Sequence, residues 1–227
     1  MNEPGKRQRL IALGDSITLG HWDEAGGWIA HLRREADKHV LRTSRRHYAT
    51  VYNLGISSNT SRHVLGRYRS EVDARHEPDD NTELFIALAV GINDSAVKTG
   101  THEHLVPPAS YDANMRALAA LGRQDADSRV VVVGPTRVDE ALTRPVTYRL
   151  EREYHLEFID AYNEIARCAA HDAGIHFVDL FGDMLPHDEY WYEWDGVHLN
   201  SHAHQRVAQL IEPVLAAMGW GHEGKTT

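Results

Sequence analysis

The sequence contains a single cysteine, Cys168, among its 227 residues, so an intramolecular disulfide is excluded. Cys168 falls in a segment with helical spacing, and we interpret it as a small buried apolar residue rather than a catalytic thiol. Long apolar runs are also missing. Because the first apolar run is only as long as a strand, we predict neither a signal-peptide core nor a membrane span, and we expect a cytoplasmic protein.

Basic residues are in the minority, since 24 Lys and Arg stand against 33 Asp and Glu and give a formal net charge of −9. A nucleic-acid backbone is bound by a basic face, so this balance predicts no nucleic-acid partner. The acidic surface is also expected to disfavour highly anionic substrates. The sequence has no internal repeat or low-complexity linker, and its length predicts one domain over residues 1–227.

Five short apolar runs rich in β-branched residues predict strands. They lack polar alternation, which is typical of strands that are buried on both faces of a parallel sheet. The runs cover residues 10–13, 50–54, 84–90, 130–133 and 176–178. Between and after them, apolar residues recur with helical spacing over residues 29–36, 115–122, 159–169 and 207–218.

Strands that alternate with helices predict a three-layer α/β/α sandwich around a central parallel sheet of about five strands. Gly174 is placed to end the third helix, and Pro213 is expected to bend or break the last one. Two longer stretches, 95–110 and 136–147, are interpreted as either a lid or a surface excursion. In such sheets, functional residues gather at the carboxyl ends of the strands.

Small and polar residues follow the first three predicted strands. The first strand leads into Gly14-Asp15-Ser16, the second into "NLGISSNTS" and the third into "GINDS", while "WDGVHLN" near the C-terminus supplies Asp195 and His198. Each motif alone is common in turns. Their order and their positions at strand ends predict that a nucleophile, free amides and an Asp–His pair converge in one site.

Together these motifs resemble the GDSL, or SGNH, hydrolase family over nearly the whole chain. The resemblance implies a flavodoxin-like sandwich and a serine ester hydrolase of the esterase, lipase or acylhydrolase type. Such an enzyme acts on small-molecule esters or related acyl groups through an acyl-enzyme intermediate. The resemblance also implies that neither a metal nor an organic cofactor is needed.

Carried onto this sequence, the resemblance makes Ser16 the nucleophile and His198 the general base, with Asp195 bound to the other imidazole nitrogen. A serine hydroxyl needs such a base because it is a poor nucleophile at neutral pH. The oxyanion hole would consist of the Ser16 backbone amide, the Asn93 side-chain amide and one amide of the second motif. Asp15 and Asp94 flank these residues, and we interpret both as structural.

The second motif departs from the family pattern N-x-G-x-S-G-x-T. Aligned on that pattern, Gly55 occupies the first glycine position and Ser58 the second, which is the usual oxyanion donor. We assign Ser58 as the third donor and keep Gly55 as the less favoured alternative. If the position requires a positive φ, a serine there is strained.

An aromatic-rich stretch, "HDEYWYEWDGVH", precedes the Asp–His motif. Its aromatic residues either line a substrate pocket or pack against the sheet end or a partner subunit. The candidates are Tyr190, Trp191, Tyr192 and Trp194, of which Trp191 and Trp194 are named as pocket residues. A homo-oligomer contact would be sought in this stretch and in "RPVTYRLEREYHLEF".

His198, His202 and His204 have a spacing that also suits a metal site, because i and i+4 histidines share a helix face. We favour a solvated helix start instead, capped by Asn200 or Ser201, and predict no metal.

Three alternatives to a serine esterase of this family are compatible with parts of the sequence. An α/β-hydrolase elbow, G-x-S-x-G, is disfavoured because Thr18 stands at the second glycine position. An acyltransferase would use the same triad with an alcohol in place of water. A catalytically silent flavodoxin-like binding module would have no need to retain Ser16, Asn93, Asp195 and His198.

Overall fold

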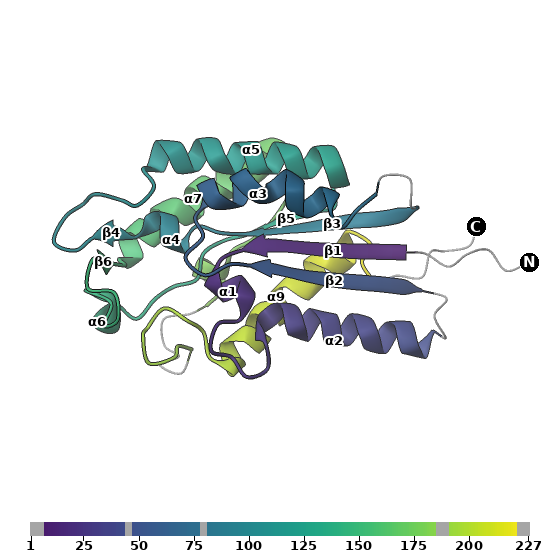
Figure 1. Ribbon diagram of the computed structural model, residues 1–227, viewed down its shortest axis with the longest axis horizontal. Coiled ribbons are helices and arrows are strands. Elements are labelled where there is room, and N and C mark those ends of the chain that lie inside the picture. Colours follow the sequence, from purple (N-terminus) through teal and green to yellow (C-terminus); the bar gives the residue numbers. More distant parts are fainter. Residues whose placement is uncertain (1–6, 44–46, 78–80, 185–190, 222–227) are drawn as a thin grey trace, which may run out of the picture.

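The computed structural model describes residues 7–43, 47–77, 81–184 and 191–221, and its core is a parallel five-stranded sheet (Figure 1). The strand order is β2-β1-β3-β5-β7. The strands are β1 (Arg7–Gly14), β2 (Tyr48–Gly55), β3 (Thr82–Ala89), β5 (Val130–Val133) and β7 (His176–Val178). All five predicted strands are confirmed, as is the flavodoxin-like three-layer architecture.

Helices cover both faces of the sheet, as Figure 1 shows. One layer consists of α2 (Gly27–Arg42) and α9 (Ser201–Ala217), and the other of α3 (Ser61–Asp73), α5 (Pro108–Ala126) and α7 (Leu156–Ala173). Successive side chains of β1 point to opposite faces. Leu10 and Ala12 therefore belong to one buried apolar cluster, whereas Ile11 and Leu13 belong to the other. No described helix has the length and apolar character to traverse a bilayer.

Three local predictions concern Gly174, Pro213 and Cys168. Gly174 ends α7 in the left-handed conformation, at φ 64°, as predicted. Pro213 does not break α9, which continues to Ala217. Cys168 is exposed, contrary to its predicted burial, because the buried stripe of α7 runs along residues 159, 162, 166, 169 and 170 and leaves Cys168 beside Glu164 on the outer face.

Short elements occupy the carboxyl edge of the sheet and the two longer connections. The short helices are α1 (Ser16–Leu19), α4 (Ile92–Ser95), α6 (Glu140–Thr143) and α8 (Leu180–Asp183). The connections also form an antiparallel pair between β4 (Val97–Lys98) and β6 (Arg152–Glu153). β4 lies within the predicted irregular stretch 95–110, whereas β6 follows the stretch 136–147, so this small sheet joins the two connections just beyond the second stretch.

The short helix α1 packs closely against the end of β2. A Cβ atom placed on Gly55 would lie 2.2 Å from the Leu19 nitrogen and 2.7 Å from the Asp15 carbonyl oxygen. Both contacts are with backbone, which cannot rotate away as a side chain could. Gly55 is therefore required by the approach of α1, which begins at Ser16.

We predict that Gly55→Ala lowers the free energy of unfolding by about 1–3 kcal/mol, because the added methyl group must displace α1. Gly66 in α3 provides a matched control, since a Cβ atom there meets nothing within 4 Å. Gly66→Ala should instead stabilise the protein by about 0.5–1 kcal/mol. Urea unfolding of both variants measures these changes, and equal effects would contradict the close packing at Gly55.

Candidate active site

Ser16, His198 and Asp195 form a continuous chain of hydrogen bonds. Ser16 begins α1 directly after β1, and its Oγ lies 2.8 Å from His198 Nε2. His198 Nδ1 lies 2.6 Å from Asp195 Oδ2. All three residues are buried. The geometry allows the imidazole to accept a proton from the hydroxyl while the carboxylate holds the other ring nitrogen.

The environment of Asp195 keeps its carboxylate ionised. Burial alone would raise the pKa of this carboxyl group. The pKa is nevertheless lowered below its ordinary value, because the carboxylate is stabilised by the hydrogen bond and charge of His198 and by the backbone amides of His198 and Val197. The two amides donate to Asp195 Oδ1 at 2.9 Å and 3.0 Å. Three residues of one loop thus fix both the charge and the orientation of the imidazole.

Asn93 lies in α4, directly after β3, and its side-chain amide has a defined orientation. Its Nδ2 donates to the Asn59 carbonyl at 3.1 Å, and its Oδ1 accepts from the Tyr154 hydroxyl at 3.0 Å. Because a carbonyl can only accept, the nitrogen and not the oxygen must face Asn59. The second N–H of Asn93 remains available for a ligand. Tyr154, which is buried directly after β6, was not predicted as a site residue.

The second motif presents Ser58 rather than Gly55 to the site. The Gly55 amide donates to Asn53 Oδ1 at 3.0 Å and is therefore already engaged. Ser58 has φ 65°, so it adopts the left-handed conformation that a non-glycine residue rarely adopts. Ser58 lines the same cavity as Ser16 and Asn93.

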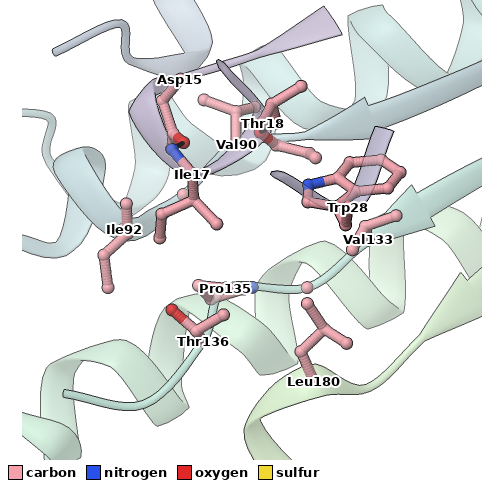
Figure 2. Close-up of a pocket in the computed structure, with 13 residues that line it drawn as sticks. Asp15, Ile17, Thr18, Trp28, Val90, Ile92, Val133, Pro135, Thr136 and Leu180 are labelled. Carbon is pink, nitrogen blue, oxygen red and sulfur yellow. Dashed lines mark hydrogen bonds between the residues drawn. The ribbon is translucent and has the colours of Figure 1, made fainter. Parts of the chain in front are cut away.

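A cavity of about 150 Å³ opens at Ser16 and His198. Besides the residues already named, it is lined by His21, Ser57, Tyr148, Arg149, Arg152 and Val197. A second cavity, shown in Figure 2, lies among the residues that follow β1, β3 and β5, including Ile17, Val90 and Pro135, and holds only about 20 Å³. That volume is enough for one water molecule and no more. Of the two cavities, the larger has room for a small organic group.

Asp15 and Asp94 are buried carboxylates that bind neighbouring backbone rather than the cavity's reacting groups. Asp15 caps α1 by accepting from the Ile17 amide at 2.9 Å, and burial raises its pKa to about 6. Asp94 accepts from the Ser61 amide at 3.0 Å and from its hydroxyl at 2.5 Å, and burial raises its pKa to about 7. These bonds agree with a structural role, in which Asp94 connects α4 to the start of α3.

The aromatic stretch divides between the core and the rim of the site. Trp191 is buried in the core and stacks on His202, so it does not line the cavity. Trp194 is 58% exposed and stacks on Trp22 at 5.0 Å, and the Trp22 ring in turn lies 4.8 Å from the His198 ring. Trp194 therefore belongs to an aromatic rim beside the cavity and, contrary to its prediction as a pocket residue, is not among the residues that line it. Tyr192 is half-buried against the core, and Tyr190 lies outside the described residues.

The C-terminal histidines lie at the start of α9, which Asn200 caps by accepting from the Ala203 amide at 2.9 Å. The described part of the chain contains no group of three side chains suited to a metal ion. His202 is exposed, as a solvated helix start requires. His204 is buried, contrary to that prediction, and neither of its ring nitrogens has a hydrogen-bond partner among the described residues. Burial lowers the pKa of His204 from its ordinary value of 6.5 to about 4.

We predict that His204 makes folding stability sensitive to acid. The folded-state pKa is depressed, so protonation favours the unfolded chain, and stability is lost as the pH falls from about 6.5 to about 4. The difference between these values corresponds to about 3 kcal/mol. Urea unfolding at pH 7 and pH 4 should show that wild type loses about this much more stability than His204→Leu. The exposed-site control His202→Leu should keep the wild-type dependence, and an unchanged dependence in His204→Leu would contradict the prediction.

Comparisons with known proteins identify the family of the chain. The model of the GDSL-like lipase/acylhydrolase family matches residues 12–206. A human relative, isoamyl acetate-hydrolyzing esterase 1 homolog, is 25% identical over 215 residues, which cover 91% of this chain and 81% of the relative.

Solved structures show the same fold. The lipase/acylhydrolase from Enterococcus faecalis is 18% identical with a TM-score of 0.69, and the match covers 92% of this chain and 96% of that one. An acetylxylan esterase from Geobacillus stearothermophilus, solved as a catalytic mutant, is 19% identical with a TM-score of 0.68 and covers 93% and 95% of the two chains.

Proposed function

This chain belongs to the GDSL-like lipase/acylhydrolase family, and from that premise we propose that it is a serine esterase with Ser16 as its nucleophile. Family membership makes the protein a hydrolase acting on ester bonds. The roles of individual residues are our inference. The observation that supports them is the hydrogen-bond chain from Ser16 Oγ through His198 to Asp195.

In the proposed acylation step, Ser16 Oγ attacks the ester carbonyl carbon as its proton passes to His198 Nε2. Asp195 stabilises the imidazolium that forms. The tetrahedral intermediate then breaks its bond to the alcohol oxygen, and His198 Nε2 returns the proton to that oxygen as the alcohol leaves. The acyl group is now bonded to Ser16.

Deacylation repeats these steps with water as the nucleophile. His198 removes a proton from the water as it attacks the acyl carbon, and the proton then passes to Ser16 Oγ as the acid leaves. An alcohol could replace water and yield a new ester. Product analysis with an added alcohol distinguishes hydrolysis, which releases free acid, from transfer.

The oxyanion would be stabilised by the backbone amides of Ser16 and Ser58 and by Asn93 Nδ2. Each such donor typically lowers the barrier by about 2.7–4 kcal/mol. The Asn93 donor is useful only if its nitrogen faces the cavity. Tyr154 and Asn59 provide that orientation by binding the amide oxygen and one amide hydrogen.

We predict that Ser16→Ala lowers kcat/KM for an uncharged aryl acetate at least roughly a thousandfold, because no nucleophile remains to form the acyl-enzyme. Steady-state kinetics measure this loss. Ser110→Ala, at an exposed position of α5, is the matched control and should retain wild-type kinetics. A folded Ser16→Ala protein with near wild-type turnover would refute the assignment of the nucleophile.

We also predict that Tyr154→Phe lowers kcat about tenfold with little change in KM, because the loss of one hydrogen bond lets the Asn93 amide rotate. The same substitution in an Asn93→Ala background should have little further effect, since the group that Tyr154 positions is gone. Tyr48→Phe, at a half-exposed site, controls for the loss of a hydroxyl. Additive losses in the double variant would show that Tyr154 does not act through Asn93.

A further inference from the structure

The cavity at Ser16 is lined by two arginines, Arg149 and Arg152. Both are half-buried, and neither forms an ion pair with a carboxylate among the described residues. Arg152 Nε is buried without a hydrogen-bond partner in that part of the chain. The polar neighbour of the Arg152 side chain is the Tyr154 hydroxyl, and no described carboxylate compensates its charge. A half-buried charge without an opposite charge beside it favours an anionic ligand in the cavity.

Glu151, beside Arg152 in the chain, is exposed and does not line the cavity, and three other carboxylates are bound to other groups. Glu153 binds His155 at 3.1 Å, and Glu140 accepts from the Leu156 amide at 2.9 Å. Asp195 is bound to His198. The described residues that line the cavity include no aspartate or glutamate. The cavity is thus locally positive although the molecule carries a net charge of −9.

The backbone that carries the arginines is held in place. Arg152 pairs with Lys98 across the β4–β6 ladder, and its amide donates to the Arg149 carbonyl at 3.0 Å. Thr143 and Tyr154 exchange two further hydrogen bonds, each of 3.1 Å, at the base of this segment. The guanidinium groups therefore extend from an ordered support, which lowers the entropy lost when they bind a ligand.

We propose that the ester substrate carries a carboxylate that binds Arg149 and Arg152. The proposal rests on the proposed function, because it names the substrate class of the same site. Two carboxylate oxygens match the forked N–H groups of arginine. A cavity of about 150 Å³ fits a small group, of roughly benzene size. This inference reverses the expectation, drawn from net charge, that anionic substrates are disfavoured.

Two substrate pairs test the proposal and locate the carboxylate. Para-acetoxybenzoate and its uncharged isostere para-acetoxybenzamide place the charge on the alcohol side. Mono-p-nitrophenyl glutarate and p-nitrophenyl pentanoate place it on the acyl side, with spontaneous hydrolysis subtracted. In at least one pair, wild-type kcat/KM should be about tenfold or more higher for the charged ester, which is the effect of a charge-assisted bidentate hydrogen bond.

Arg152→Gln should lower that charged-to-uncharged ratio of kcat/KM about tenfold, and Arg149→Gln should lower it as well. Arg144→Gln is the matched control, because Arg144 is exposed on the same segment and does not line the cavity. Its ratio should equal that of wild type. The proposal would be overturned if wild type showed no preference for the charged ester in either pair. It would also be overturned if Arg152→Gln lowered kcat/KM equally for the charged and the uncharged ester, a result that would place the arginine on the oxyanion instead.

Inhibition of the wild-type enzyme provides a test that needs no variant. Benzoate should inhibit hydrolysis of an uncharged ester competitively, and benzamide should inhibit it at least about tenfold more weakly. Equal inhibition by the two would contradict a carboxylate site. The serine esterase assignment is judged separately, since wild type should hydrolyse the uncharged esters and Ser16→Ala should not.

Discussion

The in-register ends of three neighbouring strands determine where the reactive groups lie. Gly14 at the end of β1 pairs with Gly55 of β2 on one side and with Ala89 of β3 on the other. A Cβ atom on Gly14 would lie 2.1 Å from Thr18 Oγ1, so α1 can turn back over the strand only because that side chain is absent. Ser16, Ser58 and Asn93 follow these three ends within a few residues, and the sheet therefore brings them to one edge.

The connection between β5 and α7 completes the site in two ways. Its first part supports the loop of Asp195 and His198, because the Asp139 amide donates to the Gly196 carbonyl at 2.8 Å. Gly196 also packs so closely against Leu142 that a side chain at position 196 would not fit. Its last part contributes Tyr148, Arg149, Arg152 and Tyr154 to the cavity. The same connection thus supports the loop of the general base and also forms part of the cavity wall.

Much of the fold could be predicted from the sequence, because strands buried on both faces are continuous apolar runs and the strand-end motifs are local. The helix α3 was missed even though Val64, Tyr68 and Val72 are buried at intervals of four, since polar residues fill the positions between them. The positions of the Trp191 and Arg152 side chains could not be predicted from the sequence. Whether an aromatic side chain enters the core, or an arginine a cavity, depends on contacts between segments far apart in the chain. A local sequence pattern does not predict such contacts.

In the proposed mechanism, Ser16 is activated as a nucleophile by the hydrogen bond that its hydroxyl donates to His198. The most direct test is reaction with a fluorophosphonate, followed by mapping of the adduct by mass spectrometry. Such a reagent bonds covalently to an activated serine, as the acyl group of a substrate would. We predict an adduct on Ser16 in wild type and none at any residue in a folded Ser16→Ala protein. A folded wild-type protein that stays unlabelled, or that is labelled on another serine, would contradict the account.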